Sequence, residues 1–295
     1  MLHEFLDRLT EIFCELDDLA HELDVTSRGH WLRGKRSHCG GRKPTMHASE
    51  VATILLLFQA SPYRDLKHFY QDYVWEHLVE EFPGLVRYSR FVEIEKQALL
   101  LLSAFLMRHL GRCTGVSYVD STPLPVCHVR RGARNRVFAD LARFSKTTSG
   151  WFFGFKLHLT VSDRGELLGF ALTVASVDDR NRNVIARLTE RVFGKLVGDK
   201  GYIDASLFWE LRDIGIELIT SIRKNMKNKL ALLEDRAVYR CRGIIESVNH
   251  VIKDILHAQH TRHRGQLNFL TNLIASLCAY QLRSHKPTAA VRGLA

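Results

Sequence analysis

The sequence predicts an α/β fold: a mixed sheet flanked by helices, preceded by an all-helical N-terminal domain. Up to about residue 115, apolar residues recur at helical spacing, and from Val116 onward short strand-like runs alternate with helical segments. With 295 residues, 46% of them hydrophobic, the chain can bury the core of one large domain or two smaller ones. We therefore expect a helical domain over residues 1–115, a second domain over 116–285 and a tail over 286–295.

The N-terminal domain is expected to consist of helices separated by polar or basic turns. Its apolar periodicity and its Pro and Gly breaks predict helices over about residues 1–23, 45–59, 63–81 and 89–110. A link with six lysines and arginines between Arg28 and Lys43 joins the first two. Short helices with basic turns fit a DNA-binding domain, and they also fit a packing or dimerisation domain, so both interpretations stay open.

The second domain is expected to begin as an antiparallel meander and to continue with alternating helices and strands. Asp120 and Asp199 each follow a short apolar strand. Asp178 and Asp179 precede a helix and are expected to cap it. Strands are predicted at 116–119, 151–161, 167–175, 195–198 and 216–222, and helices at 181–193, 205–214 and 266–282.

The stretch from Tyr239 to Lys253 is predicted to be a helix with two different faces. Tyr239, Arg242, Glu246 and Lys253 stand three, four and seven residues apart, which stacks them on one face, while isoleucines and valines fill the opposite one. One carboxylate thus lies among cations and a phenol. Such an acid is either a surface ion pair or a metal ligand beside a polyanion.

Charge and cysteine content narrow the class of protein. The 42 lysines and arginines outnumber 32 acids, so the formal net charge is +10, which favours nucleic acid as a partner over a basic surface kept for solubility. The six cysteines form no C-x-x-C pair, which argues against a zinc ribbon or a disulfide framework. No secretory signal and no apolar run of membrane-spanning length is present, so we expect a cytoplasmic protein with no membrane partner.

Three acids are candidates for a shared site. Asp120 and Asp199 stand at strand ends, where ligands bind in sheets of this kind, and Glu246 follows the last strand on a helix. Carboxylate oxygens suit Mg²⁺ or Mn²⁺, and two such ions can activate a water and stabilise the leaving oxygen of a phosphodiester. Three crowded acids repel one another until cations arrive, which favours a metal site over unaided acid–base catalysis.

These motifs resemble those of DDE insertion-sequence transposases, which have a ribonuclease-H-like catalytic core. Asp120 lies in Y-V-D-S-T-P-L, Asp199 in G-D-K-G-Y, and the spacing Y-(2)-R-(3)-E-(6)-K from Tyr239 to Lys253 matches the signature of one group of these enzymes. The runs G-F-K-L-H-L-T-V and I-R-K-N-M-K are also typical of the class. The resemblance covers about residues 118–282.

The resemblance implies a metal-dependent DNA transposase. Asp120, Asp199 and Glu246 would be catalytic and would bind two Mg²⁺ or Mn²⁺ ions. The enzyme would nick double-stranded DNA at the terminal inverted repeats of its element and join the exposed 3′-hydroxyls to target DNA. It would work as a homodimer or higher multimer on DNA, near the nucleoid of a bacterium or archaeon. A ribonuclease-H-like nuclease without strand transfer, or a catalytically silent repressor, are the alternatives.

Further cations are candidates for DNA contact. Arg242 suits bidentate phosphate binding, Lys253 offers a mobile charge and Tyr239 can donate to phosphate or stack on a base, although an ion pair between Arg242 and Glu246 is an alternative. A loop between the first two predicted strands and a second basic run are also expected to follow phosphates. These two segments contribute Arg130, Arg131, Arg134, Arg136, Lys224 and Lys227. Lys156 and His158 lie on the polar face of their predicted strand and are candidates for the surroundings of the metals.

Overall fold

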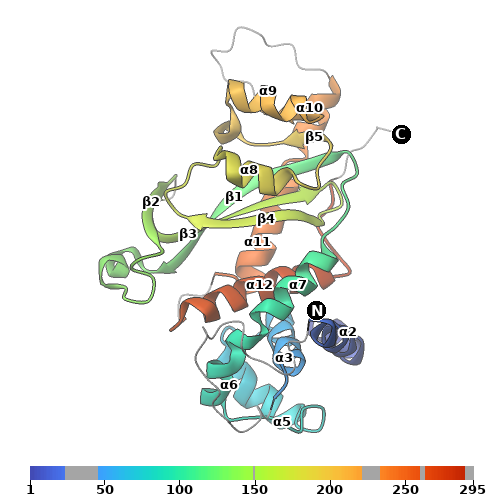
Figure 1. Ribbon diagram of the computed structural model, residues 1–295, viewed down its shortest axis with the longest axis vertical. Coiled ribbons are helices and arrows are strands. Elements are labelled where there is room, and N and C mark those ends of the chain that lie inside the picture. The colour runs from blue at the N-terminus through green and yellow to red at the C-terminus, as the bar shows by residue number, and fades with distance from the viewer. Residues whose placement is uncertain (24–45, 149, 221–232, 260–262, 290–295) are drawn as a thin grey trace. The chain divides into compact units, whose positions relative to one another are not determined.

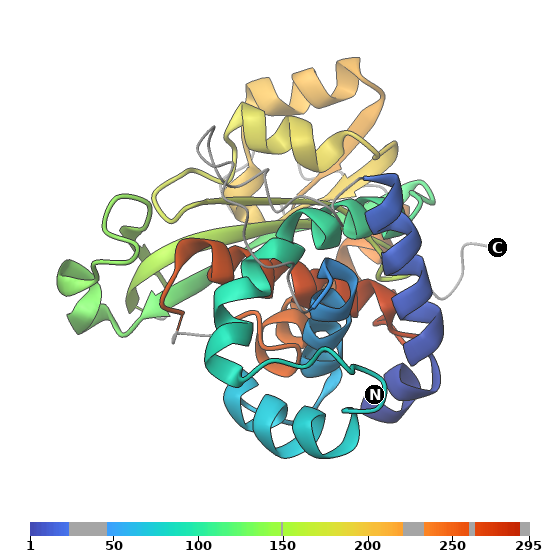
Figure 2. The ribbon, with the colours of Figure 1, turned by 60° about the horizontal axis from the view of Figure 1, so that its bottom comes forward.

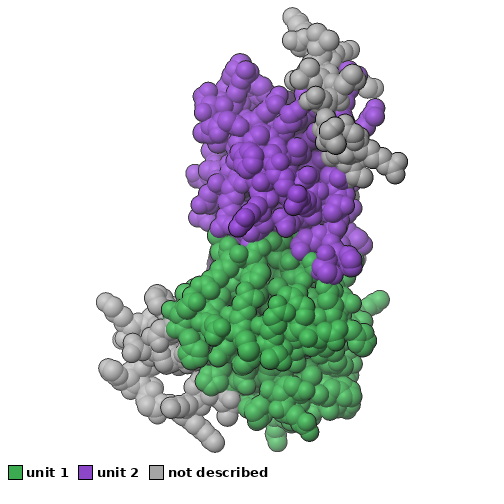
Figure 3. All heavy atoms as spheres, turned by 90° about the vertical axis from the view of Figure 1, so that its right-hand side faces the viewer, with its two compact units in different colours: residues 1–109, 254–283 green, residues 110–253, 284–295 purple. Residues whose placement is uncertain are grey.

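The computed structural model describes residues 1–23, 46–148, 150–220, 233–259 and 263–289 (Figure 1). The chain divides into two compact units: unit 1 holds residues 1–109 and 254–283, and unit 2 holds 110–253 and 284–295 (Figure 3). The division near residue 110 lies close to the boundary expected from the sequence. Residues 254–283, which were expected in the second domain, instead pack with the N-terminal helices.

Unit 1 is helical in its described residues. The helix α3 is buried along nearly its whole length and packs against α2 and α12, while α12 also packs against α7 (Figure 2). Both α3 and α12 are apolar on almost every side, which is the pattern of a helix inside a core. The elements are α1 (Leu2–Asp7), α2 (Leu9–Glu22), α3 (Ala48–Ala60), α4 (Leu66–His68), the π-helical η1 (Phe69–Val74), α5 (Trp75–His77), α6 (Tyr88–Ile94), the 3₁₀ turn η2 (Glu95–Ala98), α7 (Leu99–His109) and α12 (Gln266–Leu282).

Several predicted helices of unit 1 are divided in the structure. The helix expected over residues 1–23 breaks at Arg8, and the one expected over 89–110 is interrupted by η2. Apolar spacing does not reveal these breaks because a single irregular turn changes the direction of the chain but leaves the next apolar residues facing the core. The basic link from Arg28 to Lys43 lies outside the described residues.

Unit 2 is built on one mixed sheet, which has six strands within the described residues (Figure 1). The strand order is β2-β3-β1-β5-β6, and β4 pairs with the same edge of β3 as β2 does. Pairs between β1, β2, β3 and β4 are antiparallel, whereas β1–β5 and β5–β6 are parallel. The strands are β1 (Val116–Cys127), β2 (Arg143–Thr147), β3 (Gly150–Ser162), β4 (Leu167–Val174), β5 (Gly194–Val197) and β6 (Ile216–Ile219).

Helices flank this sheet on both faces. On one face α8 (Arg182–Thr189) and α9 (Ala205–Asp213) bury Ile185, Leu188 and Leu207 against Val119 and Leu196 of the strands. On the other face α11 (Gly243–His250) packs on β1, and the hydroxyl of Tyr118 donates to the carbonyl of Val238 in α10 (Leu233–Arg240) at 3.3 Å. The predicted mixed sheet with flanking helices is therefore confirmed, as is the helical N-terminal region.

The strand β2 was not expected. Its segment was interpreted as a basic loop because its apolar residues are few and its charges are many.

The chain has no helix long and apolar enough to cross a membrane among the residues that the structure describes.

Candidate active site

The prediction that Asp120 ends its strand is wrong, because Asp120 is the fifth of the twelve residues of β1 and is paired with Leu159 of β3. Asp199 does follow the end of the neighbouring parallel strand β5. Tyr118 of β1 pairs with Val197 of β5, and each aspartate lies two residues further along its own strand direction. Because side chains alternate along a strand, Asp120 is directed toward the face that carries Tyr118 and α11. The negative charge of Asp199 reaches the carboxyl of Asp120, so the two acids are neighbours.

The sequence around Asp199 forms a tight turn that fixes its carboxylate. Asp199 precedes the short 3₁₀ helix η4 (Lys200–Tyr202), and its Oδ1 accepts a hydrogen bond from the backbone N–H of Gly201 at 2.7 Å. A Cβ at Gly201 would lie 2.8 Å from that same oxygen, and one at Gly198 would lie 3.1 Å from the ring of Tyr202. The two glycines of G-D-K-G-Y thus make room for the aspartate and the tyrosine.

The helix α11 is tied to β1 by an asparagine. Asn249 is buried, and its Nδ2 donates to Oδ2 of Asp120 at 3.1 Å. Glu246 lies three residues before Asn249, one helical turn away on the same face. Its side chain is 60% exposed and accepts a hydrogen bond from Nη2 of Arg242 at 2.7 Å. Glu246 therefore rests in an ion pair on the helix whose next turn contacts Asp120.

The electrostatics of the site favour a bound cation. Burial, reinforced by the negative charge of Asp199, raises the pKa of Asp120 to about 6, and the nearby charge of Arg242 opposes this. Two buried polar atoms, Oδ1 of Asn249 and the hydroxyl of Tyr202, have no hydrogen-bond partner among the described residues. The charges of Asp120 and Asp199 also reach that hydroxyl. Crowded carboxylates beside unsatisfied polar atoms are a donor set that suits a hard divalent cation and its waters.

The helix expected from Tyr239 to Lys253 is interrupted, so the prediction of one continuous helix is wrong. Tyr239 lies in the last turn of α10, a tight turn follows, and Arg242 is the N-cap residue of α11. Lys253 belongs to the π-helical turn η5 (Val251–Ile255) and is half-buried. Arg242 and Glu246 still lie on the same face of α11, as predicted, because they are only one helical turn apart.

A second ion pair lies among polar residues of β3. Nζ of Lys156 donates to Oδ1 of Asp179 at 3.1 Å and to the carbonyl of Val177 at 2.9 Å. His158 is fully buried, with Nδ1 3.8 Å from the same Oδ1 of Asp179, and burial lowers its pKa to about 4. The charge of Asp179 also reaches Asp120. The Lys156–Asp179 pair therefore belongs to the electrostatic surroundings of the site.

The expected capping of α8 by Asp178 and Asp179 is wrong. The cap is Asn181, whose Oδ1 accepts from the backbone N–H groups of Asn183 and Val184. Asp178 instead pairs with Arg180, and Asp179 pairs with Lys156. Sequence reasoning also did not identify Asn249 and Tyr202. The only signals for them were the position of Asn249 one turn after Glu246 and the place of Tyr202 in G-D-K-G-Y.

The predicted basic segments fall partly within the described residues. Arg130, Arg131 and Arg134 are exposed on the 3₁₀ helix η3 (Val129–Arg134), and Arg136 is exposed just after it. Lys224 and Lys227 lie outside the described residues. Across the part of the chain that the structure covers, no three histidines, cysteines or acids lie close enough together to hold a metal ion.

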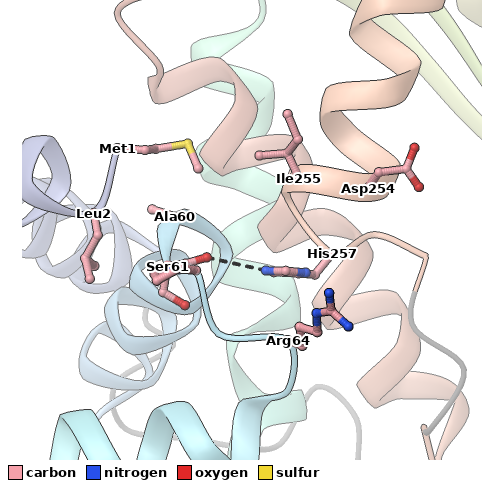
Figure 4. A pocket seen from close by; sticks show the side chains of 9 residues that line it. Met1, Leu2, Ala60, Ser61, Arg64, Asp254, Ile255 and His257 are labelled. Carbon is pink, nitrogen blue, oxygen red and sulfur yellow. Dashed lines mark hydrogen bonds between the residues drawn. The ribbon is translucent and has the colours of Figure 1, made fainter.

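Two cavities are lined by described residues of unit 1, and neither lining includes a predicted site residue. One, of about 720 Å³, is lined by residues that include Ser61, Arg64, Asp254 and His257, with Nε2 of His257 3.4 Å from the carbonyl oxygen of Ser61 (Figure 4). The other, of about 780 Å³, includes the buried carboxyl of Glu95. Asp65, Glu93 and Glu95 line the second cavity, but they form no group that could hold a metal ion. The region around Asp120 and Asp199 in unit 2 therefore remains the candidate active site.

Comparison with known proteins gives one family match and a distant structural likeness. A family model described as a transposase DDE domain matches residues 110–266. No curated protein matches the chain. Among solved structures, the chain is similar to a cryo-EM structure of the piggyBac transposase synaptic complex with hairpin DNA, with a TM-score of 0.40 and 11% identity over 77% of this chain and 51% of that one. The chain thus spans about half the length of that protein.

Proposed function

This chain belongs to the DDE transposase family, and from that premise we propose that it is a DNA transposase that nicks the ends of its element and transfers the 3′-hydroxyls into target DNA. The single observation that supports this most directly is the parallel register of β1 and β5, in which Tyr118 and Val197, each two residues before an aspartate of the proposed site, are paired. The order of strands and helices in unit 2 agrees with a ribonuclease-H-like core. In this proposal unit 2 carries catalysis, and the N-terminal helices serve DNA binding or dimerisation.

Asp120, Asp199 and Glu246 are the proposed catalytic residues. Asp120 supplies a carboxylate from within β1, Asp199 supplies one from the turn after the adjacent strand β5, and Asn249 donates a hydrogen bond to Asp120. The ion pair between Arg242 and Glu246 is exposed, and such pairs contribute only about 0.3–0.5 kcal/mol. Glu246 can therefore exchange Arg242 for a different cation at little cost. Arg242 would then be available to bind a phosphate of the DNA strand.

The same three acids are the proposed ligands of two Mg²⁺ or Mn²⁺ ions. When bound, such ions supply a Lewis acid that activates the attacking oxygen and stabilises the leaving oxygen. Asp120 and Asp199 fit that group because the pKa of Asp120 is raised by burial and by its acidic neighbour, and a divalent cation relieves both effects. Glu246 would have to leave Arg242 to join them, because the three acids do not form a metal-holding group among the described residues. Tyr202 and Asn249 offer further polar atoms to waters in the site.

Double-stranded DNA is the proposed substrate, as terminal inverted repeats and as target, with the protein acting as a dimer or higher multimer. Arg242, Tyr239 and Lys253 would contact the strand near the cut, and Arg130, Arg131, Arg134 and Arg136 would contact it further away. Arginine suits this role because its planar fork binds two phosphate oxygens at once.

The test is a cleavage and joining assay on an oligonucleotide duplex that carries one element end and its flank. We expect nicking and strand transfer by the wild-type protein only when Mg²⁺ or Mn²⁺ is added. Asp120→Asn, Asp199→Asn and Glu246→Gln should each reduce both reactions to background, because each removes one anionic ligand, while DNA binding in a gel-shift assay survives.

Asp213→Asn and Glu217→Gln are matched controls, since both acids are exposed in the same unit and lie outside the proposed site. Both controls should nick and join at the wild-type rate. Full strand transfer by any one of the three site variants would refute the assignment. Metal-dependent nicking without joining, on a substrate that offers target DNA, would instead favour a nuclease.

A further inference from the structure

One end of the sheet in unit 2 carries a short helix and a hairpin that extend beyond the flanking helices α8 and α9 (Figures 1 and 2). We call this segment the arm, and it comprises η3, β2 and the first residues of β3, over the described residues 128–148 and 150–154. The arm has six lysines and arginines and one acid, Asp140. Besides these charges, the arm has a surface of aromatic side chains.

The hairpin gathers aromatic residues on one of its faces. Phe144 pairs with Phe153 across β2 and β3, and Lys146 pairs with Trp151. Directly opposed residues of an antiparallel pair share a face, and so do residues two apart on one strand. Phe144, Lys146, Trp151 and Phe153 therefore lie on the same face. The rings of Phe144 and Phe153 are in contact, with their centroids 4.8 Å apart.

The basic helix η3 packs over this same face. A Cβ at Gly132 would lie 2.5 Å from Cζ of Phe144 and 2.9 Å from Cβ of Phe153, so the backbone of η3 rests directly on the two rings. Arg131 directly precedes Gly132 and Arg134 follows it by two residues, and both arginines are exposed. The helix that packs on the aromatic face therefore carries exposed cations.

Trp151 is the unusual residue of the arm. Its side chain is 60% exposed although it lies beside a packed aromatic cluster, and Phe144 is 43% exposed. A single exposed aromatic is common on protein surfaces, but Trp151 lies on the same face as a second exposed aromatic, Phe144, and a lysine, Lys146. Aromatic rings beside cations suit the stacking of a base next to its phosphate. Every nucleobase offers a face for such stacking, and the stacking does not depend on sequence.

Intact duplex DNA does not explain this surface. Its phosphates would satisfy the arginines, but its bases are already stacked inside the helix and leave Trp151 without a partner. An unpaired strand offers both phosphates and free base faces. On the basis of the proposed function, we propose that the arm binds an unpaired segment of DNA, with Trp151 stacked on a base and Arg131 and Arg134 on the adjacent phosphates.

The experiment measures binding of the full chain to three fluorescent DNAs without added metal. These are an oligothymidine of about 20 nucleotides, a duplex of about 40 base pairs, and that duplex with an unpaired tail. Trp151→Ala should weaken binding of the oligothymidine and the tailed duplex by about tenfold, because one stacking contact is lost. Binding of the blunt duplex should change by less than about twofold.

Trp209→Ala is the matched control, since Trp209 is 57% exposed in the same unit on α9. It should leave all three affinities unchanged. Trp151→Phe should restore most of the binding that Trp151→Ala loses, because phenylalanine can still stack on a base. Circular dichroism should confirm that each variant is folded, so that weaker binding cannot be due to unfolding. Arg131→Ala should weaken all three DNAs and reduce the dependence of binding on salt.

Equal weakening of all three DNAs by Trp151→Ala, or no weakening of any, would overturn the proposal. A change in oligomeric state with unchanged DNA affinities would also overturn it and would assign the aromatic face to a second copy of the chain. The Asp120→Asn variant keeps the arm intact and should bind the oligothymidine normally. If the wild-type protein binds unpaired DNA through Trp151 but nicks no substrate, the proposed function fails and this inference stands.

Discussion

Glu95 is a carboxyl group whose properties are set by burial. It is 6% exposed, lies at the cavity of about 780 Å³ in unit 1, and interacts with Asn268, whose Nδ2 also donates to the carbonyl of Val92 at 2.9 Å. Burial raises the pKa of Glu95 to about 8, against the weaker opposing effect of Asn268. At neutral pH this side chain is therefore a protonated acid in the folded protein.

This raised pKa predicts that Glu95 lowers stability as pH increases. Below the usual pKa of a glutamic acid, Glu95 is protonated in both the folded and the unfolded protein. Between that value and about 8, Glu95 is protonated only in the folded protein. Unfolding then releases a proton, so the contribution of Glu95 to the free energy of unfolding falls by up to about 1.4 kcal/mol per pH unit. Glu95→Gln removes this dependence while keeping the shape of the side chain.

Denaturant unfolding of the variant and the wild type at several values between about pH 5 and pH 8 tests this prediction. The stability advantage of Glu95→Gln should grow with pH across this range. Glu93→Gln is the control, since Glu93 is exposed and pairs only at the surface with Arg90, and its effect should not change with pH. Parallel stability curves for Glu95→Gln and the wild type would contradict the raised pKa.

For single residues, the sequence predicted that Asp199 follows a strand, but it placed Asp120 at a strand end that does not exist, because β1 continues well beyond it. Two prolines and few apolar residues hid that extension. The residues that hold the acids were also not predictable. Asn249 reaches Asp120 across 129 positions of sequence, and a single asparagine on a helix has no local pattern that reveals such a partner. The pairing of Asp179 with Lys156 was missed for the same reason.

Among the elements, α8 depends on a cap that differs from the expected one. Oδ1 of Asn181 accepts from the N–H of Asn183 at 3.1 Å and from that of Val184 at 3.3 Å. Asn181→Ala should lower the free energy of unfolding by about 1 kcal/mol, because both donors lose their partner at the start of the helix. Denaturant unfolding measures this loss.

Asp178→Ala provides the comparison for that cap. Asp178 pairs with Arg180 at the exposed surface, and the donors at the start of α8 bond to Asn181 instead, so the loss of Asp178 should cost less than about 0.5 kcal/mol. If Asp178→Ala lowered the free energy of unfolding by more than Asn181→Ala does, the prediction that Asp178 caps α8 would be correct after all.

Elements with a strong apolar period were predictable, whereas interruptions within them were not. The helices α8, α9 and α12 and the strands β3 and β4 occur where spacing and turn residues predicted them. The stretch from Tyr239 to Lys253 kept its apolar spacing across a tight turn and a π-helical turn, so periodicity alone suggested a single helix. Gly243, directly after the turn, was the one local signal of a break.

For the whole molecule, the net charge of +10 predicts that DNA binding is strongly dependent on salt. Each neutralised phosphate releases counterions, so raising NaCl from about 50 mM to about 200 mM should weaken duplex binding by roughly 10²- to 10⁴-fold. Fluorescence anisotropy over a salt series measures the slope. A nearly flat series would mean that the basic residues do not contact phosphates, and it would favour the interpretation of a basic surface kept for solubility.

The discontinuity of unit 1 has a consequence for how the protein is made. Its core needs α12, yet more than half of the chain is synthesised between α7 and that helix. Until the ribosome has released the segment around residue 282, the apolar sides of α3 and α7 lack their partner and are open to chaperones or to aggregation. Unit 2 has no such delay for its sheet, because all six strands precede α12. The sheet of unit 2 can therefore form during translation while the helical core of unit 1 still waits for its last helix.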